Sequence, residues 1–270
     1  MKAKFLENGI YPIHLMWETG FTEEFFDVIG GVFEPGAERV GSLRDGFDMI
    51  VERMSRSLGQ RVWREMKNGA ARSFKAGADG TKALKHLLHE IDRFPDDVRV
   101  HLAGHSAGAI LLGELIKGRD RLFPDGMKPA STTLMAPACS LDFYNEVYLP
   151  ALENGFVGNL QQLNLTDRTE LDDTVGPYGK SLLYLVSRAF DSTDPKKPQP
   201  LLGMQKYSEK LKLHANHKIL YAGSSGAPSK SKTHGGFDND THSMNHLLAT
   251  ILGVKPKGNR RFNTNDLSTF

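Results

Sequence analysis

Cysteine is nearly absent from this sequence, and its scarcity excludes a fold held together by disulfide bonds. The 270 residues contain a single cysteine, Cys139, which has no partner for an intramolecular disulfide. Packing and hydrogen bonding must therefore stabilise the fold. A chain without disulfides also fits a reducing compartment.

Long apolar runs and an excess of charge of one sign are missing too. Residues 1–11 carry charges at Lys2, Lys4 and Glu7 and lack the apolar stretch of a signal peptide. No later segment approaches the roughly 18 apolar residues that cross a bilayer. Lys and Arg total 34 against 32 Asp and Glu, so electrostatics give no general reason to expect a nucleic acid or an acidic membrane as a partner. We expect a cytoplasmic protein with no integral membrane segment.

The composition is that of a globular protein with a sizeable core. Hydrophobic residues make up 39% of the chain and charged residues 24%. No linker, internal repeat or low-complexity tract divides the chain. The sequence therefore predicts one domain over residues 1–254, followed by a polar tail at residues 255–270 that lies loosely on the surface.

Short apolar runs are the strand candidates, because strands buried on both faces of a parallel sheet have continuous hydrophobic sequences. The candidate runs are Ile10–Met16, Val98–Ala103, Ser131–Ala136, Leu160–Leu165 and Lys218–Ala222. Helical patterns separate them, and this alternation is typical of a parallel sheet with helices on both faces. The prediction is an α/β fold with a mostly parallel sheet of at least five strands.

Three segments have helical patterns. The clearest is Thr81–Ile91, whose leucines recur on one face. Residues 41–68 also have an apolar stripe, although Gly59 weakens its middle. We interpret the surplus of basic residues there as a solvated face rather than a site for an anionic partner. The third segment, Tyr178–Phe190, is apolar almost all round, which indicates a core helix or a cover. The stripe of the second segment comprises Phe47, Val51, Met54, Leu58 and Val62.

The motif that carries chemistry is Gly104-His105-Ser106-Ala107-Gly108. It follows a strand candidate and precedes an apolar helical run, so Ser106 lies in a tight strand-to-helix turn that requires small neighbours. Its hydroxyl is then expected at the carboxyl edge of the sheet, beside the free N–H groups of a helix N-terminus. A similar segment, Gly223–Gly226, runs into Ala227-Pro228 instead of a helix, and we interpret it as a loop.

On this motif and the order of the surrounding elements, residues 10–252 resemble an α/β-hydrolase. The resemblance implies a nucleophilic serine after the fifth strand of an eight-stranded sheet, followed in the chain by an acid and then a histidine. This chain departs from the family at its start, where one strand rather than four precedes the motif. If Ile10–Met16 corresponds to the third strand, the remaining five are contiguous, and the fold has a shortened N-terminal side.

A serine nucleophile needs a base to remove its proton and a carboxylate to orient that base. His234 is the predicted base, because it lies in a glycine-rich loop after the last strand candidate, as the resemblance implies. His242 is an alternative on the helix that follows. For the acid we favour Asp167, at the end of the strand Leu160–Leu165. Asp172 and Asp173 follow in the same loop and remain alternatives, and any of the three could instead cap a helix.

The oxyanion of an acyl transfer needs two preorganised donors. The N–H of Ala107 is the first candidate, and the second is expected among Thr19, Gly20 and Phe21, after the first strand candidate. Segments 41–75 and 139–158 are candidate helical covers. The candidate pocket residues are Trp17, His105, Phe143 and Tyr144.

Metal and nucleotide motifs are missing. No H-E-x-x-H, no cysteine cluster, no G-x-G-x-x-G and no phosphate-binding loop occurs, so we expect neither a metal nor a cofactor. The sequence thus predicts a serine esterase, or a lipase-like enzyme, that cleaves a small-molecule carboxylic ester through an acyl-enzyme. Two alternatives stay open: hydrolysis of another acyl bond (thioester, peptide or lipid), or a binding protein that keeps the fold without catalysis.

Overall fold

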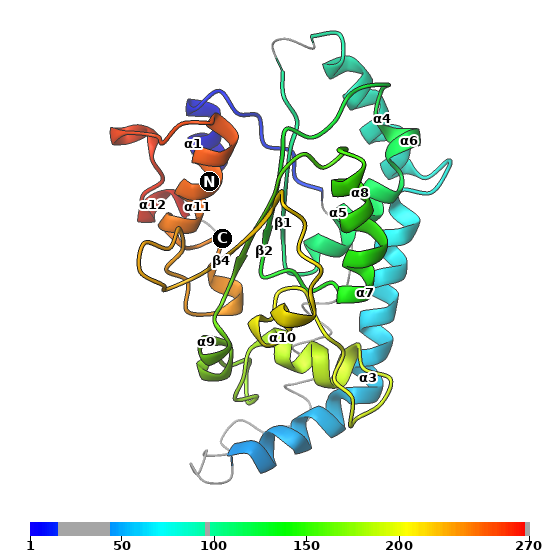
Figure 1. Ribbon diagram of the computed structural model, residues 1–270, viewed down its shortest axis with the longest axis vertical. Helices are drawn as coiled ribbons and strands as arrows, with labels where there is room; N and C mark the ends of the chain where they lie inside the picture. The colour runs from blue at the N-terminus through cyan, green and yellow to red at the C-terminus, as the bar shows by residue number, and fades with distance from the viewer. Residues whose placement is uncertain (16–43, 95–97, 268–270) are drawn as a thin grey trace.

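The computed structural model describes residues 1–15, 44–94 and 98–267. A parallel sheet occupies its centre (Figure 1), in the order β1-β2-β3-β4. The register aligns His105 with Met135, and Met135 with Leu163, so the strands end together at one edge. An α/β fold with a parallel sheet is therefore confirmed. The strands are β1 (His101–His105), β2 (Ser131–Met135), β3 (Leu160–Asn164) and β4 (His217–Tyr221).

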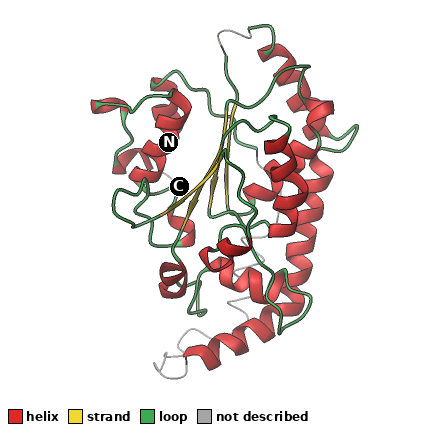
Figure 2. Ribbon diagram, in the orientation of Figure 1, coloured by secondary structure: helices red, strands yellow, loops and turns green. Residues whose placement is uncertain are grey.

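Helices lie on both sides of the sheet (Figure 2). On one side are α3 (Arg44–Ser73), α4 (Asp79–Ile91), α5 (Gly108–Lys117), α6 (Arg119–Leu122), α7 (Leu141–Phe143) and α8 (Leu149–Glu153). On the other are α1 (Lys2–Glu7), α11 (Thr241–Leu252) and α12 (Thr264–Leu267). Two short helices, α9 (Asp167–Asp172) and α10 (Leu182–Leu185), lie beyond the carboxyl edge of the sheet. The first helix candidate, Thr81–Ile91, is confirmed as α4.

The first strand candidate in the chain, Ile10–Met16, does not belong to the sheet. Residues 10–15 are irregular and pair with no described strand, and Met16 lies outside the described residues. Pro12 lacks the N–H that a strand interior needs, and the side chains of Tyr11 and Ile13 are exposed, so neither pairing nor burial favours a strand. The described part of the sheet has four strands rather than the five or more expected.

Helix α3 confirms the long helix expected at residues 41–68, and Val51 and Val62 of the expected stripe are buried, but the rest of the buried side differs. Met54 and Leu58, expected in the core, are about half exposed (52% and 45%). The buried side follows Val51, Ser55, Val62, Trp63, Met66 and Ala70. Gly59 lies on this side, and a Cβ there would stand 2.2 Å from the ring of Phe190. The glycine that weakens the helical pattern is what allows a second segment to approach the helix.

That second segment is the one expected as a core helix or a cover. It consists of α10 and a π-helical turn at Val186–Phe190, and most of its side chains are buried. Arg56 of α3 donates from Nη1 to the carbonyl of Arg188 (3.1 Å) and from Nη2 to that of Ser192 (2.7 Å). The segment is therefore part of the core, and one of the basic residues of α3 serves internal hydrogen bonds.

The C-terminal residues are not a loose tail as far as they are described. The ring of Phe262 is buried and meets that of Phe5 edge to face, with 5.1 Å between the centroids. Asn8 donates from its side chain to the carbonyl of Arg260 (2.9 Å), and Leu267 is buried against the core. Two buried apolar side chains and hydrogen bonds to α1 and its C-cap Asn8 thus hold residues 255–267 against the N-terminal helix.

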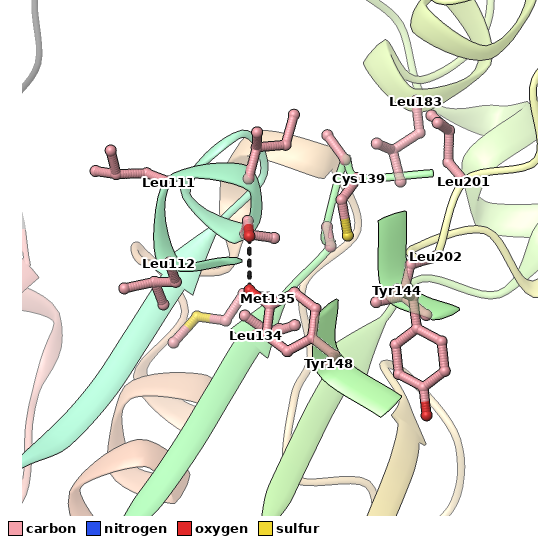
Figure 3. Close-up of a cluster of buried hydrophobic side chains, with 14 of the residues drawn as sticks. Leu111, Leu112, Leu134, Met135, Cys139, Tyr144, Tyr148, Leu183, Leu201 and Leu202 are labelled. Carbon is pink, nitrogen blue, oxygen red and sulfur yellow. Dashed lines mark hydrogen bonds between the residues drawn. The ribbon is translucent and has the colours of Figure 1, made fainter. Parts of the chain in front are cut away.

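A buried polar network joins α7 and its continuation to the sheet. Gln162 of β3 donates from Nε2 to the carbonyl of Leu202 (2.8 Å), so its Oε1 accepts from Nε2–H of His217 (2.9 Å). Nδ1 of His217 then accepts from the hydroxyl of Tyr144, 3.0 Å away. Figure 3 shows Tyr144 and Tyr148 among the buried leucines. In this arrangement Nε2 carries the hydrogen and Nδ1 accepts, which is the neutral form of His217 that its burial favours.

The burial of His217 makes the stability of the fold depend on pH. Burial, aided by the nearby His214, lowers the pKa of His217 from 6.5 to about 4. Since the unfolded state binds the proton more readily, the contribution of the neutral ring is complete above pH 6.5 and is lost as the pH falls towards about 4. That contribution amounts to about 3 kcal/mol.

We expect His217→Gln to be less stable than the wild type at neutral pH and to lose this disadvantage progressively at acidic pH. Other titrating groups, among them the buried His234, are common to both proteins and cancel in the comparison. Urea unfolding of both proteins across this pH range measures the difference. A difference that stays constant with pH would contradict the role given to His217.

Candidate active site

Ser106 occupies the turn between β1 and α5, as the sequence predicts, and its backbone is left-handed with a φ of 54°. This conformation costs a residue with a Cβ about 1–2 kcal/mol. Three backbone hydrogen bonds hold it: Ser106 N–H donates to Met135 (2.9 Å), and its carbonyl accepts from Ala109 (3.1 Å) and Ala138 (3.0 Å). The turn is thus fixed to β2 and to α5, and Ser106 itself remains partly exposed.

The two glycines of the motif have different roles. A Cβ on Gly104 would lie 2.9 Å from Cδ1 of Leu112 and 3.0 Å from the backbone carbon of Gly108. A Cβ on Gly108 would have no described atom within 4 Å. The expected need for small residues on both sides of Ser106 therefore applies at Gly104, where the strand meets the first turn of α5, but not at Gly108.

His234 meets Ser106, as the sequence predicts. Its Nε2 lies 2.8 Å from Oγ of Ser106, across 128 positions of sequence. The ring is buried and belongs to a 3-10 turn, His234–Gly236, in the loop after β4. A serine hydroxyl at hydrogen-bond distance from an imidazole is the arrangement from which a base can remove the hydroxyl proton.

The peptide groups on both sides of His234 are held by side chains. Its N–H donates to Oδ2 of Asp173 (2.8 Å), and its carbonyl accepts from Nε2 of His105 (2.8 Å). Because a carbonyl oxygen can only accept, Nε2 of His105 must carry the hydrogen. Neither bond was expected: His105 was a pocket candidate, and Asp173 was an alternative for the acid. A histidine directly before the serine was visible in the motif, but no spacing indicates its partner.

Of the acid candidates, Asp173 alone is bonded to His234. Asp167 accepts instead from the hydroxyl of Tyr184 (2.7 Å), so the favoured acid is turned towards α10. Asp172 is exposed and has a loose ion pair with Arg168 (3.8 Å). Thr166, not an aspartate, caps α9.

The second ring nitrogen of His234, Nδ1, differs from Nε2 in its contacts. Nδ1 is buried and has no hydrogen-bond partner among the described residues. The two oxygens of Asp173 accept from backbone N–H groups, those of His234 and Thr174, the latter at 2.7 Å. In the observed state the carboxylate therefore fixes the main chain of the histidine loop rather than the ring.

Burial controls the charge of the site. It lowers the pKa of His234 from 6.5 to about 3, with a smaller contribution from His105. Burial also raises the pKa of Asp173, although its two backbone hydrogen bonds oppose the shift. Glu170, buried behind them, has its pKa raised to about 8, chiefly by burial. At neutral pH His234 is therefore uncharged, which is the form that accepts a proton.

Donors for a developing negative charge lie beside the serine. The N–H groups of Ala107 and Gly108, at the start of α5, donate to no described acceptor. Ala107 thus has an N–H next to Ser106 that no acceptor in the described part of the chain occupies, as an oxyanion donor requires. The candidates for the second donor, Thr19, Gly20 and Phe21, lie outside the described residues, as does the pocket candidate Trp17.

The pocket candidates Phe143 and Tyr144 do not lie at the site. The hydroxyl of Tyr144 reaches His217, the first residue of β4, whereas Ser106 follows the last residue of β1; in a parallel sheet these are opposite edges. The ring of Phe143 packs on Gly113, and Nζ of Lys117 lies 4.8 Å from its centroid. Phe143 is thus half-buried beside α5, and Tyr144 is buried next to β4, so both side chains serve packing.

Other chemistry has little support in the described residues. No group of three or more His, Cys, Asp or Glu side chains there is arranged to hold a metal ion. His246 bonds Gln161 (2.6 Å), and His242 lies near Asp240 (3.5 Å). None of the helices described has both the length and the hydropathy to cross a membrane.

Comparisons with known proteins leave the family open. The chain matches no model of a known protein family, no curated protein and no solved structure. What this site can do must therefore be argued from its own geometry.

We expect the two glycines of the motif to respond differently to alanine. Gly104→Ala forces the strand away from the backbone of α5 and should cost about 1–3 kcal/mol of unfolding free energy. Gly108→Ala meets open space at a helix start and should be neutral or slightly stabilising. Chemical unfolding of the two variants and the wild type measures this contrast. Equal losses in both variants would contradict the packing described here.

Proposed function

We propose that this protein is a serine hydrolase that cleaves carboxylic esters through an acyl-enzyme. The observation that carries the proposal is the 2.8 Å contact between Oγ of Ser106 and Nε2 of His234. The strained, left-handed turn of Ser106 supports it, because strained backbone is concentrated at functional sites. The N–H of Ala107, which donates to none of the described residues, adds the third element that acyl transfer requires.

In the proposed reaction, Ser106 is the nucleophile and His234 the general base. Nε2 of His234 takes the hydroxyl proton while Oγ attacks the ester carbonyl, and the resulting oxyanion accepts from the N–H of Ala107. The imidazolium then gives its proton to the leaving alcohol, which leaves an acyl group on Oγ. A water molecule, deprotonated by the same ring, releases the acid and restores the serine.

The imidazolium intermediate assigns a role to Asp173. A buried ring whose pKa is lowered to about 3 forms a cation only if a nearby negative charge stabilises it. Asp173 is the acid candidate bonded to the histidine loop, so in the proposed mechanism it replaces Asp167 as the carboxylate. It stabilises the cation by its charge and fixes the loop by its two backbone hydrogen bonds.

The order of the elements favours an enzyme of the α/β-hydrolase type. In that family the acid and the histidine follow the serine in the chain. Here Ser106 follows β1, Asp173 lies after β3 and His234 after β4, and the strands are contiguous and parallel. The proposed assignment places the described strands on the C-terminal side of the family sheet. Fold and catalytic groups do not choose between an ester and a thioester, peptide or lipid. Ester hydrolysis is proposed rather than peptide hydrolysis because an ester carbonyl is attacked more readily than a resonance-stabilised amide.

We expect the wild type, but not Ser106→Ala, to react with a fluorophosphonate probe and to hydrolyse a short p-nitrophenyl ester. The substitution removes the attacking oxygen and leaves the backbone bonds of the turn in place, so the fold should persist. Intact mass and peptide mapping of the adduct measure the first reaction, and release of p-nitrophenol measures the second.

A control variant and a null outcome complete the test. Ser225→Ala alters a serine in the loop after β4 and should leave the reaction unchanged. If the wild type forms no adduct and hydrolyses none of the ester, thioester and peptide substrates, the non-catalytic alternative holds and the proposal is wrong.

The acid can be tested with matched asparagine variants. Asp173→Asn should lower kcat at least about 100-fold, because it removes the charge beside the imidazolium and one of two backbone contacts. Asp172→Asn alters the exposed neighbour and should change kcat less than about threefold. Asp167→Asn should weaken a bond to Tyr184 and affect stability more than turnover. A larger loss of kcat in Asp167→Asn than in Asp173→Asn would reverse the assignment.

A further inference from the structure

His105, the residue before the serine, holds the histidine loop. Its Nε2–H donates to the carbonyl of His234 (2.8 Å), while the next side chain along the chain, that of Ser106, meets Nε2 of the same histidine (2.8 Å). Two consecutive residues of one turn thus contact the main chain and the ring of a single residue on a distant loop.

This double contact depends on the backbone of Ser106. Successive side chains of a strand point to opposite faces, which would direct His105 and Ser106 away from each other. The left-handed φ of Ser106 breaks this alternation, so both side chains face His234. The geometry of the turn therefore sets the position of the loop as well as that of the hydroxyl.

We propose that His105 is a positioning residue, whose hydrogen bond to the carbonyl of His234 sets the distance between the base and the nucleophile. This inference rests on the proposed function, in which that distance matters for proton transfer. His105 acts through His234 and touches no reacting atom. Its ring carries the hydrogen on Nε2, the tautomer that the carbonyl acceptor requires.

The alternative is that His105 serves only as a packed ring. Its centroid lies 5.4 Å from that of His234 and 6.2 Å from that of Phe237, a buried residue of the same loop. Packing and hydrogen bonding are separable, because one substitution retains the ring and another retains the donor. His105→Phe keeps an aromatic ring without an N–H. His105→Gln keeps an N–H at a similar reach without the ring.

The test compares kcat and KM for the p-nitrophenyl ester, and the rate of phosphonylation, among the wild type, His105→Phe and His105→Gln. We expect His105→Phe to lower kcat and the phosphonylation rate about 10- to 100-fold, because a small misplacement of catalytic groups has effects of this size. KM should change less than about twofold, since binding is not affected. His105→Gln should recover the wild-type rates to within about threefold.

A control on the same strand accounts for general damage. His101, at the other end of β1, bonds Oγ of Ser131 through Nδ1 (2.8 Å), so His101→Phe also removes one histidine bond across the sheet. It should leave kcat unchanged. Unfolding in urea shows that each variant is folded under the assay conditions.

Nitrogen NMR of the imidazole rings supplies a readout that does not require turnover. In the wild type and in His105→Gln, the ring of His234 should give the same signals, whereas in His105→Phe they should shift as the contact with Ser106 is lost. The proposal is wrong if His105→Phe retains the wild-type rates and ring signals, or if His105→Gln is as impaired as His105→Phe. A wild type that fails to react at all refutes the proposed function, and the ring signals then still decide whether His105 positions His234.

Discussion

The left-handed backbone of Ser106 is the constraint on which the rest of the candidate site depends. It ends β1, starts α5 and directs two consecutive side chains towards His234. Its cost of about 1–2 kcal/mol is offset by the three backbone hydrogen bonds that fix the turn and by the absence of a Cβ at Gly104. Without this bend the side chains of His105 and Ser106 would point to opposite faces of the sheet, and they could not both contact His234.

The parts of the molecule that local sequence determines were predictable. Glycines around a serine, between a strand and an apolar helix, identify the turn of Ser106 because few sequences tolerate such a bend. The runs expected as strands are found as β2, β3 and β4; both faces of β2 and β3 are covered, whereas β4 is more exposed. His234 could be anticipated from its place after the last strand, although that inference came from the family resemblance rather than from spacing.

What failed depends on contacts between distant segments. Asp167 lies where an acid is expected, but Tyr184 binds its carboxylate, and Asp173 at the other end of α9 reaches the histidine loop instead. The buried side of α3 includes Gly59, where the ring of Phe190 packs, and the sequence of α3 alone does not identify that partner. At Ile10–Met16 the missing N–H of Pro12 argues against a strand, whereas the prediction followed the hydrophobicity of the run. The first two errors are cases in which tertiary contacts override a local preference, whereas the third neglects a local signal.

Asp173 and His105 hold His234 by its backbone N–H and carbonyl rather than by its ring, so the contacts that fix the loop differ from those that would take part in catalysis. The backbone N–H and carbonyl that they bind are present in every amino acid except proline, which lacks the N–H. These two contacts therefore do not depend on the side chain of residue 234. A substitution at this position can therefore remove the activity while the fold is retained, so related proteins can differ in activity and share the same loop structure.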